Sequence, residues 1–274
     1  MKAECPICPH RCGLDEGQTG LCGARKNTGG KISCESYGKI TSIALDPIEK
    51  KPLRLFFPGT YILSAGSYGC NLHCPFCQNH SISMPKDKPD ASYVSPAALI
   101  ENALSLKARG NIGIAYTYNE PLVGYEYVLD CSRLAREKGL KNVLVTNGYI
   151  NEEPLKRLLP YIDAMNIDLK SFSNIFYEKI GGDVTTVKRA ISIAAGLAHI
   201  EVTTLIIPGE NDSRSEMENL SSWLSGIDGD IPLHISRFFP RYKYSGMAPT
   251  PVNVIYSLAE IARKHLRNVY TGNC

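Results

Sequence analysis

The sequence predicts an α/β protein whose core is a partial (β/α)6 TIM-like barrel, preceded by a small cysteine-rich module that binds metal. From Tyr61 onward, short strand-like runs alternate with amphipathic helical stretches, a pattern typical of a parallel sheet with right-handed crossovers. The first thirty residues hold four cysteines and many glycines but little apolar periodicity. Such a segment cannot build its own core and needs a covalent or metal staple.

The chain has 274 residues, which is enough to bury a sizeable core. We expect two units, a cysteine-rich module with a hairpin over residues 1–58 and the barrel over residues 59–274. The 30 lysine and arginine residues nearly balance the 27 aspartate and glutamate residues, so the charge does not favour a nucleic-acid or membrane surface. With no apolar leader and no membrane-length segment, we expect a soluble, cytoplasmic protein.

The module is organised by cysteines. Seven of the ten cysteines fall in two tight groups, and in a cytosolic protein such grouping indicates metal ligation rather than disulfides. The first group suits either a Zn(Cys)4 site or an iron–sulfur cluster, and its members are Cys5, Cys8, Cys12 and Cys22. His10 is an alternative ligand or a surface histidine. The spacing leaves the metal open.

Two segments connect this module to the barrel. Residues 31–45 alternate in the manner of a β-hairpin, with Tyr37-Gly38 as its turn. Residues 46–53, D-P-I-E-K-K-P-L, are punctuated by prolines and are expected to be extended.

The barrel is predicted to contain six strands separated by helices. The strand-like runs are Tyr61–Ser64, Ile112–Tyr118, Asn142–Thr146, Ala164–Leu169, Ile200–Ile207 and Leu233–Phe238. Ser95-Pro96 opens the first helix as N-cap and first helical residue, and Gly139 ends the second. Three later helices are expected at Val184–Ala195, Ser213–Ser225 and Val252–Leu266. The length allows six β/α units beside the module but hardly eight.

The second cysteine group directly follows the first barrel strand. Cys70, Cys74 and Cys77 have the spacing C-x3-C-x2-C. Three thiolates can hold three irons of a [4Fe-4S] cube and leave the fourth iron open to a small molecule. A zinc knuckle completed by His73 is the structural alternative.

Polar residues gather where the strands end, which is where ligands bind in parallel α/β folds. The second strand ends in T-Y-N-E-P, the third in T-N-G, and the fourth in N-I-D-L-K. Unpaired charges at a strand end are costly, so Asp168 and Lys170 indicate a site rather than packing alone. An internal ion pair that only orders the barrel remains the alternative.

These motifs together resemble a known family. The chain resembles radical S-adenosylmethionine (SAM) enzymes of the pyruvate formate-lyase activating type, and more closely their AmmeMemoRadiSam-system branch. The matching motifs span nearly the whole chain and are C-x2-C-P-H-x-C, D-P-I-E-K-K-P-L, G-C-N-x2-C-x-F-C-Q-N, Y-T-Y-N-E-P, D-L-K and S-R-F-F-P-x-Y-K. The second strand departs from the superfamily pattern, with N-E-P where G-G-E-P is usual.

The resemblance implies a role for several residues. It places the [4Fe-4S] cluster on Cys70, Cys74 and Cys77. It implies that further side chains contact SAM or, for some of them, a monovalent cation: Phe76 along the adenine, Asn119 and Glu120 at the amino group, Asp168 and Lys170 near the carboxylate and ribose, His234 at the ribose, and Thr146, Asn166 and Asp168 around the cation. The ordinary alternatives are core packing for Phe76, a solvated turn at Asn119-Glu120 and a structural histidine at position 234.

The activity implied by this resemblance is reductive cleavage of SAM. An electron from a flavodoxin or ferredoxin would generate a 5′-deoxyadenosyl radical, which takes a hydrogen atom from a substrate. Three function classes stay open: a radical enzyme acting on a protein or peptide, one acting on a small molecule or free amino acid, and a non-catalytic iron–sulfur or zinc protein. The sequence names no substrate.

Overall fold

The core of the protein is one eight-stranded sheet. The computed structural model describes residues 1–85 and 87–274. The sheet order is β14-β13-β12-β11-β10-β9-β7-β6, so neighbours in the sheet follow one another along the chain. Its strands are β6 (Ser42–Pro47), β7 (Tyr61–Gly66), β9 (Asn111–Tyr116), β10 (Lys141–Thr146), β11 (Ala164–Asp168), β12 (His199–Ile206), β13 (Leu233–Arg237) and β14 (Val269–Gly272).

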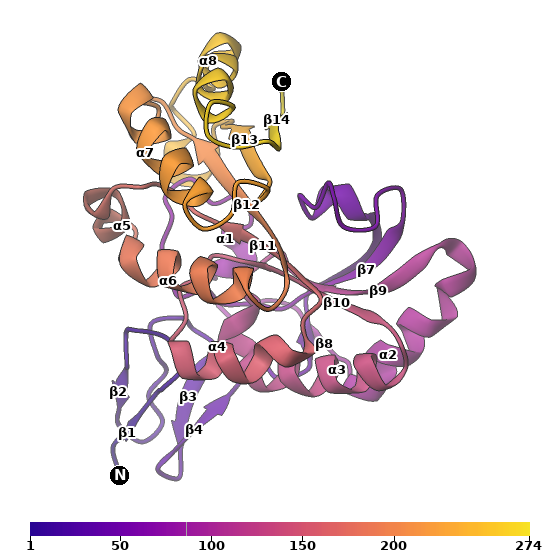
Figure 1. Cartoon of the computed structure of the whole chain (residues 1–274). Coiled ribbons are helices and arrows are strands. Elements are labelled where there is room, and N and C mark those ends of the chain that lie inside the picture. Colours follow the sequence, from indigo (N-terminus) through magenta and orange to yellow (C-terminus); the bar gives the residue numbers. More distant parts are fainter. Residues whose placement is uncertain (86) are drawn as a thin grey trace.

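The strands from β7 to β14 are parallel, whereas β6 runs antiparallel to β7. All six predicted barrel strands are present, within two residues of their expected ends. β6 and β14 form the two edges of the sheet, which is therefore open rather than closed into a full barrel (Figure 1). The predicted partial barrel is confirmed, with one additional strand at each edge.

Helices connect successive strands and cover the sheet (Figure 1). They are α1 (His80–Ser83), α2 (Pro96–Ser105), α3 (Tyr125–Glu137), α4 (Glu152–Leu158), α5 (Asn174–Lys179), α6 (Val184–Ala195), α7 (Arg214–Ser225) and α8 (Val252–Ala262). Ser95 caps α2 by accepting a hydrogen bond from the Ala98 backbone, and Ser213 caps α7 in the same way through Glu216. No helix in the described part of the chain has the length and hydrophobicity needed to cross a membrane.

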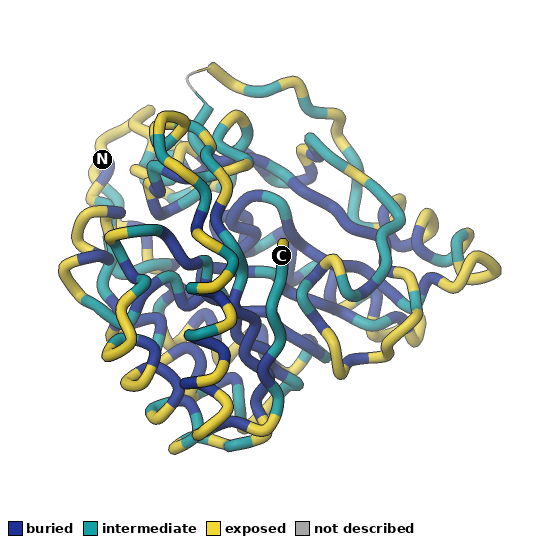
Figure 2. The backbone as a smooth tube through the Cα atoms, turned by 90° about the horizontal axis from the view of Figure 1, so that it is seen from above, coloured by how far each residue is buried: buried dark blue, intermediate teal, exposed yellow. Residues whose placement is uncertain are grey.

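Buried residues run through the middle of the molecule, and exposed residues lie mostly in the segments around it (Figure 2). The larger cluster lies between the sheet and its helices and includes Leu144 and Ile167. A smaller cluster joins strand residues to the segment that follows β6, and its members are Ile48, Leu53, Phe56, Ile62, Ala115, Val143 and Ala164. This segment was predicted to be extended, which is wrong in part, because Ile48–Lys50 is a 3-10 helix that inserts Ile48 against the strands.

The predicted hairpin over residues 31–45 is also wrong. Lys31–Cys34 (β4) pairs with Arg25–Thr28 (β3), and Lys39–Ile40 (β5) pairs with Ser92–Tyr93 (β8). β6 then joins the main sheet beside β7. Alternation of apolar residues identifies strands but does not specify their partners, so the sequence indicated the extended segments and not their pairing.

The N-terminal module contains β1 (Ala3–Glu4) and β2 (Gly13–Leu14), which pair with each other, and the β3–β4 hairpin. In Figure 1 these indigo and violet strands lie at one end of the molecule, below α4. The division at residue 58 stays a prediction. The pairing of β6 with β7 favours a boundary nearer residue 41.

Candidate metal and cofactor site

Cys70, Cys74 and Cys77 lie on the loop that follows β7. The Cys77 backbone N–H donates to the Cys74 carbonyl over 3.2 Å, forming a turn that brings the last two cysteines together. Cys74 is 7% exposed, and burial raises the pKa of its thiol to about 12. Burial and the nearby Glu120 charge also raise the pKa of Cys70 well above its usual range. The raised pKa values favour protonated thiols at Cys70 and Cys74 in the absence of metal, and metal binding would displace these protons.

The donor set of this loop fits a cluster with three protein ligands. The sulfur of Cys70 accepts weak hydrogen bonds from the Leu72 backbone (3.4 Å) and from Asn147 Nδ2 (3.7 Å), the kind of contact that tunes a thiolate ligand. Within the described residues, no three histidine, cysteine, aspartate or glutamate side chains converge on a single-ion site. His73 is exposed, so the geometry does not favour a zinc knuckle.

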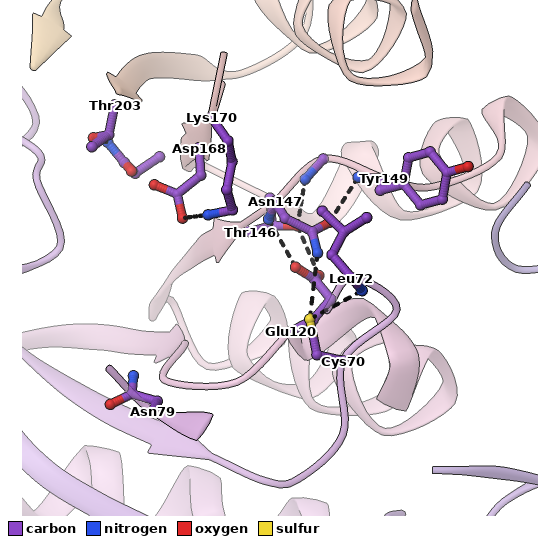
Figure 3. Close-up of polar contacts among 12 residues, drawn as sticks. Cys70, Leu72, Asn79, Glu120, Thr146, Asn147, Tyr149, Asp168, Lys170 and Thr203 are labelled. Carbon is purple, nitrogen blue, oxygen red and sulfur yellow. Dashed lines mark hydrogen bonds and ion pairs between the residues drawn. The ribbon is translucent and has the colours of Figure 1, made fainter. Parts of the chain in front are cut away.

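Glu120 joins the ends of β9 and β10 (Figure 3). Its Oε1 accepts hydrogen bonds from Leu122 N (3.0 Å) and Thr146 Oγ1 (2.8 Å), and its Oε2 accepts one from Asn147 N (2.8 Å). The residue is 3% exposed, and burial raises its pKa to about 7 although the hydrogen bonds favour the ionised form. A buried side chain with three backbone and hydroxyl donors is not part of a solvated turn.

Asn119 positions the cysteine loop directly. Its Oδ1 accepts a hydrogen bond from Ser67 N over 3.0 Å, and its Nδ2 donates to the Gly69 carbonyl over 3.0 Å. Both partners lie just before Cys70 in the loop. The side chain of this N-E-P motif therefore holds the loop entrance against the end of β9.

Two asparagines that were not predicted from the sequence belong to the same network. Asn147 Nδ2 donates to Asn71 Oδ1 over 2.9 Å, and Asn71 Nδ2 donates to the Tyr149 carbonyl over 2.6 Å. Both asparagines are buried. Their signal was visible in the motifs, because Asn71 follows the first loop cysteine and Asn147 is the centre of T-N-G.

Asp168 and Lys170 form an ion pair at the end of β11, with 2.8 Å between Oδ2 and Nζ (Figure 3). The pair remains partly exposed. Burial opposes the charge of Lys170, but the carboxylate of Asp168 and the thiol of Cys74 keep its pKa raised. Its positive charge therefore lies near the cysteine loop, where it favours a thiolate at Cys74.

The three side chains expected around a cation make their hydrogen bonds elsewhere. Thr146 donates to Glu120, and Asn166 Nδ2 donates to the Pro52 carbonyl and to Thr203 Oγ1, each over 2.9 Å. Asp168 pairs with Lys170. Asn166 Oδ1 is buried and accepts no hydrogen bond from the described residues. The cation site stays a prediction.

His234 lies near the amino end of β13. It contacts Glu201, a residue that was not predicted from the sequence. Its Nε2 is 2.6 Å from Glu201 Oε2, and its ring stacks on Tyr270. Glu201 is fully buried, and its other oxygen contacts His199 Nε2 at 3.0 Å. A carboxylate inside the apolar run I-E-V-T-T was the signal, of the same type that singled out Asp168.

Phe76 packs among aromatic side chains. Its ring centroid lies 6.0 Å from that of Phe176 and 6.1 Å from that of Tyr244. Tyr244 belongs to the C-terminal segment whose Lys243 N donates to the Pro75 carbonyl over 2.9 Å. This segment thereby covers the cysteine loop, and Phe76 is 7% exposed.

The four cysteines of the module also come together. One small cavity is lined by all four of them, Cys5, Cys8, Cys12 and Cys22. Its other lining residues include Arg25, Asn71 and Val123. Burial raises the pKa of Cys8 to about 11 and raises that of Cys22. The His10 ring also lines the cavity, with its Nε2 at 2.8 Å from the Asn71 carbonyl oxygen.

Comparisons with known proteins give a consistent result. The family model for the Radical SAM superfamily matches residues 65–221. The uncharacterized protein MJ0808 of Methanocaldococcus jannaschii is 40% identical over 276 residues, covering 99% of this chain and 81% of its own. The pyruvate formate-lyase-activating enzyme of Clostridium pasteurianum is 24% identical over 170 residues, covering 58% of this chain and 67% of its own. A domain of the pyruvate-formate lyase-activating enzyme from Bacteroides vulgatus superposes with a TM-score of 0.52 at 15% identity, covering 59% of this chain and 99% of that domain.

Proposed function

Because this chain belongs to the radical SAM superfamily, we propose that the loop after β7 carries the [4Fe-4S] cluster on Cys70, Cys74 and Cys77. These three thiolates would hold the cluster, and a cluster held there would supply the electron for reductive cleavage of bound SAM and so for radical hydrogen abstraction from a substrate. The observation that carries the proposal is the position of these cysteines at the carboxyl end of the parallel sheet, among buried and half-buried polar residues of three neighbouring strands.

The surrounding residues hold the loop and orient the cofactor. Asn119 fixes the loop entrance, and Glu120 ties the ends of β9 and β10 behind it. The partly exposed Asp168–Lys170 pair offers both a carboxylate and an ammonium to the polar groups of SAM. For His234, Phe76 and the cation ligands the predicted contacts are retained as proposals. In this structure each of them already has a protein partner or lies within the core.

We propose a protein or peptide as the substrate and a flavodoxin or ferredoxin as the electron donor. Two features support this choice. The sheet has open edges at β6 and β14, which leaves a side by which an extended segment can approach. A relative and a structural neighbour are named as activating enzymes of pyruvate formate-lyase. Modification of a small molecule or free amino acid is the alternative within the same chemistry.

The decisive experiment is anaerobic reconstitution followed by incubation with SAM and dithionite. We expect the wild type to form 5′-deoxyadenosine and the Cys74→Ala variant to form none, because that variant lacks one of the three cluster ligands. Cys274→Ala is the matched control, since Cys274 is exposed and outside both cysteine groups. A cluster-loaded wild type that forms no 5′-deoxyadenosine would leave a non-catalytic metal protein as the better description.

The substrate class is tested separately. A glycine-centred radical signal in electron paramagnetic resonance (EPR), appearing on a candidate partner protein after incubation, would support the protein substrate. Consumption of SAM coupled to a small molecule, with no radical on any partner tested, would favour the alternative.

A further inference from the structure

The four cysteines of the N-terminal module form a ligand set that differs in kind from the barrel loop. Three thiolates leave one iron of a cubane open, whereas four thiolates complete its coordination. A metal centre on Cys5, Cys8, Cys12 and Cys22 therefore has no free position for a substrate. Such a centre either stabilises the fold or transfers electrons.

The cavity formed by these cysteines is also lined by a residue with a buried, unpartnered hydrogen-bond donor. Arg25 lines it and is 3% exposed. The two Nη atoms of Arg25 bind Glu126 at 2.6 and 2.7 Å, but its Nε is buried and has no hydrogen-bond partner in the described part of the chain. A buried, unpartnered donor is costly unless an acceptor lies against it. Thiolate or sulfide sulfur of an anionic centre is such an acceptor.

The arrangement of the thiols favours a cluster over a single ion. A zinc ion draws four sulfurs to about 2.3 Å from one point. Across the described residues, no three potential ligands converge in this way, although all four cysteines line the same cavity. Thiols that surround a volume rather than a point suit a cluster of several irons.

This cavity is joined to the barrel loop by backbone contact. Cys70 N donates to the Cys22 carbonyl over 3.1 Å, so a ligand residue of one site is hydrogen-bonded to a ligand residue of the other. Gly69 has φ of +93°, and a Cβ there would lie 2.6 Å from the Cys22 oxygen and 2.8 Å from Ala24 Cβ. The loop and the module therefore touch with no room for a side chain between them.

A second connection runs through the asparagines. Asn71 lines the cysteine cavity and is the residue after Cys70. Its side chain accepts from Asn147, whose Nδ2 also lies 3.7 Å from Cys70 Sγ. One hydrogen bond thus links the two cysteine groups directly, and Asn71, which is covalently joined to Cys70, borders the cavity of the other group. Electron tunnelling is favoured by such short covalent and hydrogen-bonded paths.

We propose that Cys5, Cys8, Cys12 and Cys22 hold a redox-active iron–sulfur cluster that relays electrons to the centre on the barrel loop. A reduced flavodoxin or ferredoxin loses one electron to this cluster. The cluster returns to its oxidised state when it passes that electron to the loop centre, and no bond is made and no proton moved. The proposal rests on the proposed function for its electron acceptor.

The identity of the metal is the first test. A Cys70/Cys74/Cys77 triple alanine variant retains only the N-terminal ligand set. After anaerobic reconstitution we expect about four irons and four sulfides per chain and a reducible EPR signal. Stoichiometric zinc, or neither metal, would overturn the relay.

The second test measures electron transfer to the barrel-loop cluster by rapid-freeze EPR, before SAM is added. With reduced flavodoxin as donor, we expect reduction of that cluster to be lost in Cys12→Ala and retained in Cys274→Ala. Dithionite, a small reductant, is expected to reduce it in both variants. Equal rates with flavodoxin in Cys12→Ala and wild type would overturn the proposal.

A measurement on the wild type covers the case in which Cys12→Ala does not fold. With substoichiometric flavodoxin, the N-terminal signal is expected to appear first and to decay as the loop signal grows. Appearance of the loop signal first would contradict the relay. Failure of the proposed function has a different signature, since no 5′-deoxyadenosine would then form even with dithionite.

Discussion

Glu201 on β12 connects the segment after β6 with two histidines of the sheet. It is fully buried and accepts hydrogen bonds from the Arg54 and Leu55 backbones as well as contacting His199 and His234. Burial alone would raise its pKa, but these four donors outweigh burial and lower it to about 2. The segment after β6 is thereby fastened to β12 and β13 by one ionised side chain.

The depressed pKa predicts how stability depends on pH. The contribution of Glu201 is complete above pH of about 4.5 and is lost as the pH falls toward 2, because protonation then favours the unfolded chain. A shift of this size corresponds to about 3 kcal/mol at most. Urea unfolding of the metal-free protein between pH 7 and 2 should show this slope in wild type. Glu201→Gln should be less stable at pH 7 and should lack that part of the slope, whereas an unchanged slope would contradict the assignment.

The hydrogen bonds of Asn119 give a second prediction for a single residue. Asn119→Ala removes the bonds to Ser67 N and Gly69 O, so that the half-buried Ser67 N–H loses its side-chain acceptor and Gly69 O keeps only the Glu120 backbone N–H as a donor. We expect a loss of about 1–3 kcal/mol in unfolding free energy and a lower iron content after reconstitution. Asn119→Asp keeps the acceptor for Ser67 and is the matched control, with a smaller loss of iron. If Asn119→Ala retained full iron content, the loop would not depend on this residue.

Residue types were predicted from the sequence more successfully than residue partners. Cysteine spacing and charges at strand ends identified Glu120, Asp168 and Lys170, and all three lie at the carboxyl end of the sheet. Asn71 and Asn147 were missed because neutral amides are common in turns and their partner lies 76 positions away in the chain. A local pattern holds no information about such a contact.

At the scale of elements, the contact between the cysteine loop and the module depends on one glycine. Gly69→Ala would impose a left-handed backbone on an alanine and would drive its Cβ into Cys22 and Ala24. Gly59→Ala is the matched control, because Gly59 has φ of +81° but open space around its Cβ position. We expect Gly69→Ala to cost clearly more unfolding free energy than the control and to lower iron loading. Equal losses of unfolding free energy in the two variants would show that the module and the loop are not in close contact at Gly69.

The elements themselves were largely predictable because each barrel strand and long helix carries its own apolar period. The short helices α1, α4 and α5 were not predicted, since four to seven residues give too little periodicity. Edge strands β6 and β14 were also missed as members of the sheet. Their assignment depends on which neighbour they pair with, and pairing is a long-range property.

For the whole molecule, the proposed site predicts stabilisation by its cofactor. SAM binds only the folded, cluster-loaded protein, so at about one hundred times its dissociation constant it should add about 2.7 kcal/mol to the unfolding free energy. Thermal unfolding under anaerobic conditions should show an increase for reconstituted wild type. The same measurement on Cys74→Ala should show none, and an equal increase in both would place SAM away from the loop.

The strand order has a consequence for how the protein is made on the ribosome. Because each strand from β7 to β14 pairs with the strand synthesised just before it, the sheet can grow as the chain emerges. The N-terminal module cannot complete its contacts in the same way. The carbonyls of Pro6 and Ile7 accept hydrogen bonds from Asn151, which is translated some 145 residues later. The cavity that the four cysteines line is itself completed only by Asn71 and Val123, so the thiols are translated well before the last of its walls. In the nascent chain these cysteines are therefore open to oxidation, or to metal uptake, until that part of the barrel has been made.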